Sequence, residues 1–259
     1  MIPQLYYYDL SERVTAFSTT RHGGVSLGNY ASLNVNAYCG DTIEHITENR
    51  HLLCRSLHLS DTSCLVIPHQ VHGNEVRRIT EDFFRQPETV RQPLLEGVDA
   101  VMTDVRYVCV GVSTADCIPI LIYDPKHHCA SAVHAGWRGT VVRIAEKTVA
   151  SMMETYGSRP SEMKAVIGPG ISLAAFEVGQ EVYDAFCQAR FPMELISERQ
   201  QKWHINLPLC NRLQLESMGL APENIAQSDI CTYANVDDFF SARRLGIQSG
   251  RIFTGIVLR

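Results

Sequence analysis

The chain lacks the features of several protein classes. No run approaches the roughly 20 apolar residues that a membrane-spanning helix needs. The N-terminal segment MIPQLYYYDLSERV has neither the basic start nor the apolar centre of a secretory signal. A formal net charge of −5 gives nucleic acid or an anionic membrane no electrostatic attraction. We therefore expect a cytoplasmic protein that has neither a nucleic acid nor a membrane as its partner.

Paired cysteines are also absent. The chain has nine cysteines, an odd number, and no CxxC pair. A disulfide framework is typical of much shorter secreted chains with an even number of cysteines. Most of the cysteines are therefore expected to be small buried hydrophobic residues in a reducing compartment.

No repeat, low-complexity stretch or linker rich in Pro, Gly or Ser divides the sequence. The 259 residues are 45% hydrophobic and 20% charged, which is ordinary for a globular protein. The sequence therefore predicts a single domain over residues 1–259.

Hydrophobic spacing predicts the elements of the first half. Residues 41–62 have apolar positions at helical intervals, and residues 64–68 resemble a short strand. The charged segment 76–97 contains two prolines and is interpreted as a long loop. From Val98 onward, short apolar or β-branched runs indicate strands: VDAVMTD, YVCVGVS, IPILIYD and HCASAVH.

The second half mixes both kinds of element. Thr140 is expected to cap a helix that ends at Gly157, and further helices are expected near residues 180–189 and 207–218. Three segments are expected to be strands: KAVIGPGI, IAQSDICT and GRIFTGIVL. Because strands and helices do not alternate regularly, the pattern favours an α+β fold with mixed sheets.

Three short segments contain the residues of most chemical interest: HQVHG, TADCIP and VHAGWRG, with His72, Cys117 and His134. A thiolate and two neutral imidazoles are good zinc ligands, and three protein ligands leave a fourth position open for water or substrate. The ligands would be 45 and 17 residues apart, which is no zinc-finger spacing, and an isolated Cys or His usually has a structural role. Asp116 is open to three interpretations: neighbour of a ligand, cap or catalytic acid.

The motifs of the chain, taken in order, resemble those of the multicopper polyphenol oxidase (laccase) domain family, whose members are also described as purine nucleoside phosphorylases and peptidoglycan editing factors. The resemblance extends from about Phe17 to the C-terminus and rests on these segments: TTRHGGVS, SLN, HQVHG, VDAVMTD, STADCIPIL, HAGWRGT, IGPGIS, FEVG, CTY and FFSARR. It implies one metal bound by His72, Cys117 and His134, and a compact sandwich of mixed β-sheets between helical layers. Two departures are a long gap between the first two ligands and Ala242 where many relatives have Tyr.

The resemblance implies a zinc-dependent purine nucleoside phosphorylase. Adenosine, inosine or methylthioadenosine and inorganic phosphate would give the base and the sugar 1-phosphate, with adenosine deamination as a companion activity. A laccase with several coppers is less consistent with the sequence, because one His/Cys/His site cannot hold four coppers and HxH repeats are absent. Copper in the same site would still permit slow oxidation of phenols, since copper(II) outcompetes zinc at most such sites.

Phosphate requires cationic groups, and the sequence offers several. Arg21 precedes two glycines whose loop could present N–H groups, and Arg138 lies just before a predicted helix. For each arginine, a structural salt bridge is an equally good interpretation. The complete set of candidate residues for substrate and phosphate is Arg21, Asn34, His69, Arg138, Glu177, Arg243 and Arg244.

Two other function classes fit the same residues. Cys117 and His134 could form a metal-independent nucleophile and base, as in a hydrolase that edits peptidoglycan precursors. Alternatively, the metal could stabilise a non-catalytic binding protein, in which case Asp116 or His69 would complete the coordination. A hydrolase of the first kind would need no metal, so stoichiometric metal in the protein argues against it. A fourth protein ligand that closes the metal site would support the second alternative.

Overall fold

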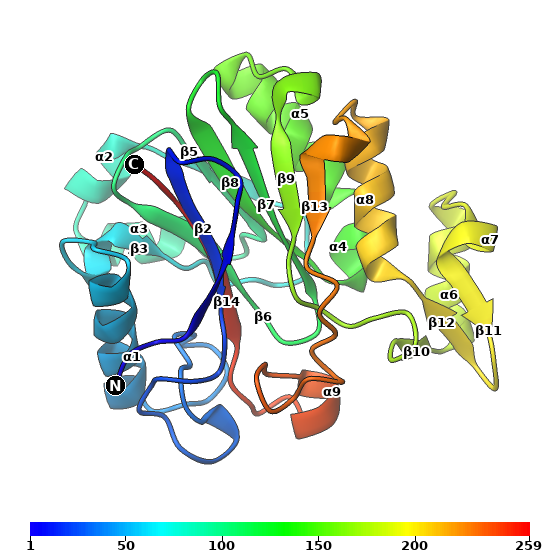
Figure 1. Ribbon diagram of the computed structural model, residues 1–259, viewed down its shortest axis with the longest axis horizontal. Coiled ribbons are helices and arrows are strands. Elements are labelled where there is room, and N and C mark those ends of the chain that lie inside the picture. The colour runs from blue at the N-terminus through cyan, green and yellow to red at the C-terminus, as the bar shows by residue number, and fades with distance from the viewer.

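Two β-sheets pack face to face in the computed structural model, which describes residues 1–259 (Figure 1). The first sheet has the order β1-β2-β14-β6-β3 and is antiparallel except for the pairing of β3 with β6. Its strands are β1 (Leu5–Tyr8), β2 (Val14–Thr19), β14 (Ile252–Leu258), β6 (Cys109–Thr114) and β3 (Leu65–Val66).

The second sheet is mixed and has the order β13-β9-β7-β8-β5-β4. The two edge strands β13 and β4 run parallel to their neighbours, and the inner pairs are antiparallel. Its strands are β13 (Ile225–Gln227), β9 (Lys164–Ile167), β7 (Ile118–Asp124), β8 (Cys129–Ala135), β5 (Ala100–Thr103) and β4 (Val76–Ile79).

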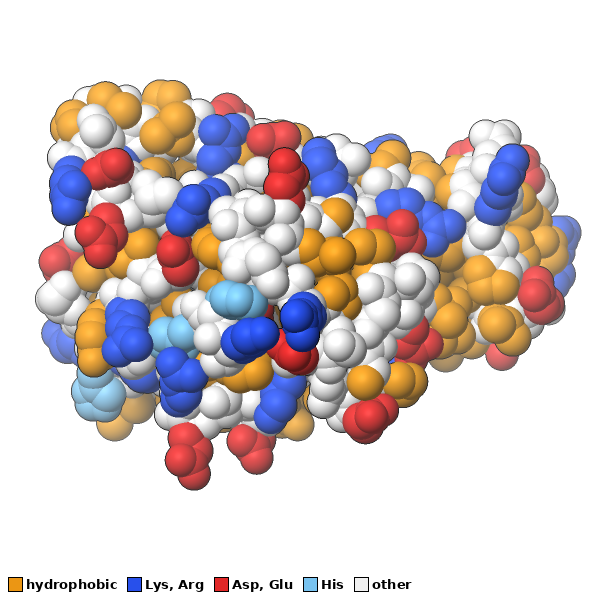
Figure 2. All heavy atoms as spheres, turned by 90° about the horizontal axis from the view of Figure 1, so that it is seen from above, with side chains coloured by type: hydrophobic (Ala, Val, Ile, Leu, Met, Phe, Trp, Pro, Cys, Tyr) orange, Lys and Arg blue, Asp and Glu red, His pale blue; other side chains and the backbone are white.

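A third, small antiparallel sheet projects at the right of Figure 1 and forms a separate lobe in Figure 2. It consists of β10 (Glu177–Val178), β12 (Trp203–Ile205) and β11 (Ser197–Arg199), next to helices α6 (Gln180–Gln188) and α7 (Met193–Ile196). The other helices are α1 (Ile43–Ser56), α2 (Glu81–Arg85), α3 (Glu88–Leu94), α4 (Trp137–Val141), α5 (Ile144–Tyr156), α8 (Leu207–Ser217) and α9 (Ala242–Leu245). None of them has the length and apolar character needed to cross a membrane.

Alternation along the buried strands divides the core into layers. In β7, Ile120 and Ile122 face α5 and α8, whereas Leu121 and Tyr123 face the first sheet. The outer face of the first sheet packs against Leu53 of α1. Successive side chains of a strand point to opposite faces, and both faces of β7 are covered. Every residue of β7 is therefore buried. This layering confirms the predicted α+β sandwich with helices outside both sheets.

Two sequence-based predictions about elements were wrong. Segment 76–97 is not a long loop, because β4 pairs in parallel with β5 and two short helices follow it. Thr140 does not cap a helix: α4 already begins at Trp137, and α5 begins after Arg143, whose φ of 62° is left-handed. Gly157, with φ 70°, does end α5 as predicted.

Candidate metal centre

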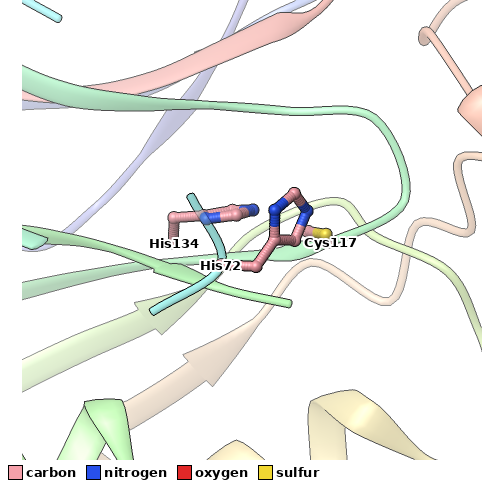
Figure 3. Close-up of side chains that lie close together, drawn as sticks. All are labelled: His72, Cys117 and His134. Carbon is pink, nitrogen blue, oxygen red and sulfur yellow. The ribbon is translucent and has the colours of Figure 1, made fainter. Parts of the chain in front are cut away.

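His72, Cys117 and His134 converge from three positions in the fold (Figure 3). His72 lies between β3 and β4, Cys117 lies directly before β7, and His134 is the sixth residue of β8. In the β7–β8 ladder, Ile118 pairs with Ala135 and Pro119 with His134, so the register brings Cys117 beside His134. One ligand atom from each of the three residues lies within 4.8 Å of the other two.

Asp99, just before β5, positions two of the three ligands. Its Oδ1 accepts a hydrogen bond from Nδ1 of His134 at 2.7 Å and one from the backbone N–H of His72 at 2.9 Å. Its Oδ2 accepts from the N–H of Gly73 at 2.7 Å. The carboxylate therefore fixes the loop that carries His72, and it holds His134 in the tautomer whose Nε2 is free to bind a metal.

The backbone beside the ligands is constrained. His72 has a φ of 63° and Asp116 a φ of 85°, a region that side chains other than glycine adopt rarely. Gly136 follows His134 closely, and a Cβ there would lie 2.8 Å from Cδ2 of His72 and 3.0 Å from Sγ of Cys117. Only glycine therefore leaves room for the imidazole and the thiol to meet at this point.

The charges of the three residues favour the thiolate. Burial opposes ionisation of Cys117, but His134 and His72 outweigh burial and lower its pKa to about 6. Burial likewise disfavours the charged form of His134, but Cys117 and Asp99 raise its pKa to about 9. The pKa of Asp99 itself is lowered: burial raises it, and the bond from His134 is the main opposing cause. The thiolate is the form of cysteine that binds metals.

These residues fit a single zinc ion. Zinc–ligand bonds of about 2.0–2.3 Å at tetrahedral angles place ligand atoms roughly 3.5 Å apart, so the 4.8 Å cluster needs only a small contraction. No fourth His, Cys or carboxylate belongs to the cluster. Asp116 is unsuited to that role, because its carboxylate accepts hydrogen bonds from Thr232 Oγ1 and from the N–H of Arg243, both at 2.7 Å.

The ligands open onto a cavity of about 600 Å³, a size typical of small-molecule sites. Among its lining groups, the hydroxyls of Ser113 and Thr114 are buried and have no hydrogen-bond partner in the protein. The side chain of Gln70 binds the backbone of Ser113 in β6. Its amide donates to the carbonyl of Ser113 and accepts from the N–H of Ser113, both at 2.8 Å. The other polar lining residues are Asn36, Tyr38, Cys39, His69, Gln248 and Arg251.

Of the substrate residues expected from the sequence, the structure brings only His69 to this cavity. Its Nδ1 lies 2.5 Å from Oε1 of Glu96, and its ring stacks on Tyr38 with centroids 4.0 Å apart.

The other expected residues lie elsewhere. Arg21 donates to the carbonyls of Ala31 and Val236, at 2.8 and 2.7 Å. Asn34 is buried, and its amide oxygen accepts from the N–H of Arg251 at 3.1 Å. The remaining residues outside the cavity lining are Arg138, Glu177, Arg243 and Arg244.

Most of the residues around the ligands and the cavity had no role assigned from the sequence, and Asp99, Thr114 and Arg251 illustrate why. Asp99 and Thr114 belong to VDAVMTD and STADC, two of the motifs that carried the resemblance. The available signal for a role at the site was an acidic or hydroxyl residue within or beside an apolar strand. Arg251 lines the cavity, but its guanidinium donates to the carbonyls of Ser249, Gly250 and Ile247. Nothing in the sequence around Arg251 indicated this position.

Comparisons with known proteins show the family to which the chain belongs. Residues 15–259 match the family described as multi-copper polyphenol oxidoreductase laccase. The chain is 44% identical to a Bacteroides thetaiotaomicron protein named purine nucleoside phosphorylase, over 98% of this chain and 96% of the relative. It is 40% identical to a protein of an unknown prokaryotic organism named adenosine deaminase RL5, over 95% and 94% of the two chains.

A solved structure has the same fold. The crystal structure of the hypothetical protein YfiH from Bacillus licheniformis has a TM-score of 0.92 and 27% sequence identity, and it covers 99% of this chain and 97% of its own. A match over nearly the whole length, together with relatives of 44% and 40% identity, establishes the family. This chain is a member of the multi-copper polyphenol oxidoreductase laccase family.

Proposed function

We propose that this protein is a zinc-dependent purine nucleoside phosphorylase that converts adenosine or inosine and inorganic phosphate into the base and ribose 1-phosphate. Methylthioadenosine is a further proposed substrate. The observation that carries the proposal is a cluster of three metal ligands with an open side, at a cavity of nucleoside-binding size. Relatives over the full length of the chain bear the name of this activity.

Bound zinc would supply Lewis acidity at the cavity, where His72, Cys117 and His134 would hold it. The chain's own groups orient the substrate. Ser113 and Thr114 line the cavity beside the metal ligands, and the amides of Asn36 and Gln248 are proposed to bind a purine edge. The His69–Glu96 pair is placed to hold or move a proton at the rim of the cavity, because Glu96 orients the imidazole through Nδ1.

Adenosine deamination is the second proposed activity, and its support is the relative named adenosine deaminase at 40% identity. Zinc deaminases add water to a purine at C6, with a carboxylate as the proton carrier. Asp99 is already engaged by His134 and by the N–H groups of the His72 loop, so the proposed proton carrier is Glu96, which contacts the lining residue His69.

Three other functions have less support. A multicopper oxidase needs several metal clusters, and His72, Cys117 and His134 form the only group of His, Cys and carboxylate ligands in the chain that could hold an ion. A copper ion in place of zinc would allow phenol oxidation as a side activity. The Cys117/His134 hydrolase and the metal-stabilised binding protein remain as alternatives: the hydrolase would turn over without a metal, and the binding protein would show no turnover at all.

The test is conversion of adenosine and inosine by metal-quantified protein, with and without phosphate, followed by mass spectrometry. Cys117→Ala removes a ligand, and Cys187→Ala, an exposed cysteine of α6, is the matched control. We expect phosphate-dependent release of base and ribose 1-phosphate that Cys117→Ala abolishes and Cys187→Ala retains. Inosine formed from adenosine without phosphate would support the deaminase activity. No turnover of either nucleoside by fully metallated protein would refute the purine hypothesis, and turnover that persists in excess chelator would favour the thiol hydrolase.

A further inference from the structure

A second cavity lies beside the metal cavity, and the two share only the lining residue Tyr38. It measures about 480 Å³ and lies between α1, the turn at Thr62–Cys64 and the segment of α2 and α3. Its apolar wall consists of Ile43, Leu65, Val66, Ile67, Phe83 and Leu95. Within this wall are two arginines, Arg50 and Arg91, and the hydroxyl residues Thr47, Thr62 and Ser63.

Arg50 is a partly buried cation without an anionic partner. It extends from α1, and its Nε donates to the carbonyl of Val35 at 2.9 Å. The other four of its five N–H groups have no partner in the protein, and no carboxylate oxygen lies within ion-pair distance of 4.0 Å. Burial lowers the pKa of Arg50, and the opposing influence of Tyr38 and Glu88 does not cancel it. A guanidinium in this state is stabilised by any anion that enters the cavity.

Arg91 reaches the same cavity from α3. Its Nη1 donates weakly to the carbonyl of Ser63 at 3.3 Å, and its guanidinium carbon lies 5.7 Å from the centre of the Phe83 ring. Its Nε is buried and has no hydrogen-bond partner. A buried N–H group without a partner costs stability, and native structures rarely retain one without a bound water, ion or ligand.

One carboxylate, Glu88, also lines the cavity, and it opposes an anion. Its Oε1 accepts from Nε2 of Gln92 at 3.1 Å, and it forms no ion pair with either arginine. The charged side chains of the cavity are thus two cations and one anion that is already hydrogen-bonded elsewhere. The surplus of positive charge and free N–H donors calls for a ligand with a double negative charge and several acceptor oxygens.

We propose that this cavity binds a phosphate group through Arg50 and Arg91. The ligand is inorganic phosphate or the phosphate of a small organic phosphate whose remaining part contacts the apolar wall. The proposal goes beyond the reaction proposed above and depends on none of its steps, because it concerns equilibrium binding in a cavity that contains no metal ligand.

The test is isothermal titration of the full-length, metal-loaded protein at constant ionic strength. Inorganic phosphate and adenosine 5′-monophosphate are the two probes. Arg91→Gln removes the charge and the unpartnered N–H, and we expect it to weaken binding about tenfold or more. The matched control is Arg55→Gln on the same helix α1, since Arg55 is exposed, pairs with Glu48 and does not line the cavity. Arg55→Gln should change the affinity less than about twofold.

Arg50→Lys complements these variants, because it keeps the charge but loses the planar fork of donors. It should bind phosphate more weakly than the wild type, and thermal unfolding must show that it is folded. If it is not folded, Arg91→Gln alone decides.

The outcomes separate the two ligand sources. Binding of both probes, with competition between them, assigns the cavity to the phosphate group itself. Binding of the nucleotide alone assigns it to organic phosphates. The proposal is overturned if neither probe binds at up to about 10 mM, or if Arg91→Gln binds as tightly as Arg55→Gln. Cys117→Ala should still bind phosphate here, so failure of the phosphorylase hypothesis would leave this result unaffected.

Discussion

At the scale of single residues, Asp99 links the fold to the metal centre. It is fully buried, and its two oxygens accept hydrogen bonds from His134, from the N–H of His72 and from the loop that follows. A carboxylate behind a metal-binding histidine fixes the orientation of the ring and raises its basicity. Asp99 therefore holds His72 and His134, which are distant in sequence, in place beside each other.

Asp99→Asn should therefore weaken metal binding about 10- to 100-fold. The amide keeps the size of the side chain but loses the negative charge that the His134 Nδ1–H and the loop N–H groups require. The measurement is competition for zinc against a chelator of known affinity, with Asp104→Asn as control because Asp104 is exposed and pairs with Arg78. Equal zinc affinity of both variants would contradict the positioning role of Asp99.

At the scale of elements, the β7–β8 hairpin determines where two of the ligands lie. The register of the two strands sets Cys117 beside His134, and the turn at the other end of the hairpin fixes that register. Asp124 closes the turn: its Oδ1 accepts from the N–H of Lys126 at 2.8 Å, and its Oδ2 lies 2.6 Å from Nδ1 of His127. The turn and the metal ligands thus belong to one structural unit.

Asp124 should make stability depend on pH. Burial raises its pKa, but hydrogen bonds, those from Ser158 and His127 above all, lower the pKa below its usual value near 3.8. A depressed pKa means that the stabilisation is present above pH 4 and is lost as the pH falls through the folded-state pKa. Asp124→Asn should therefore cost about 1–3 kcal/mol of unfolding free energy at pH 7, and the difference from the wild type should shrink below about pH 4.

Urea unfolding of both proteins between pH 7 and about pH 2.5 measures this effect, because the range must extend below the depressed pKa of Asp124. The control is Asp82→Asn, since Asp82 is an exposed residue of α2 and should change stability little at any pH. A constant difference between Asp124→Asn and the wild type over the whole pH range would show that the charge of Asp124 is not the cause.

At the scale of the whole molecule, the sandwich supplies the rigidity that the site requires. The two sheets share an apolar interior, and α1 lies against one outer face while α5 and α8 lie against the other (Figure 1). The candidate ligands lie at the end of this packed body: His134 is in β8 and Cys117 directly precedes β7, and both strands are buried along their whole length. Packing of this density holds the strand ends in place, and Asp99 in turn holds the loop that carries His72.

Leu121→Ala tests the interior between the sheets. Leu121 is fully buried in β7 and contacts the first sheet, so its truncation leaves a cavity and should cost about 2–5 kcal/mol. Leu195→Ala in α7 is the matched control, because Leu195 is 60% exposed and should cost little. Denaturant unfolding gives both values, and a loss below about 1 kcal/mol for Leu121→Ala would argue against a tight interface between the sheets.

The sequence by itself determined the class of fold and the elements with strong local signals, and it predicted the ligand types. The thiol and imidazoles of Cys117, His72 and His134 were recognisable because their chemistry suits zinc and their motifs resemble a known family. Helices α6 and α8 were predictable from hydrophobic spacing and turn residues. The end of α5 was predictable because Gly157 adopts a left-handed conformation that favours glycine.

Tertiary structure decided the rest. Strand β4 exists because β5 pairs with it, which no local pattern reveals in the charged segment that contains it. Asp99, Thr114 and Arg251 lie at the metal cavity because strands and loops far apart in sequence end at one place, whereas Arg21 is engaged by backbone carbonyls. Burial and the acceptors that neighbouring groups leave free decide which group each arginine binds. Both are properties of three-dimensional packing that residue types and spacing do not contain.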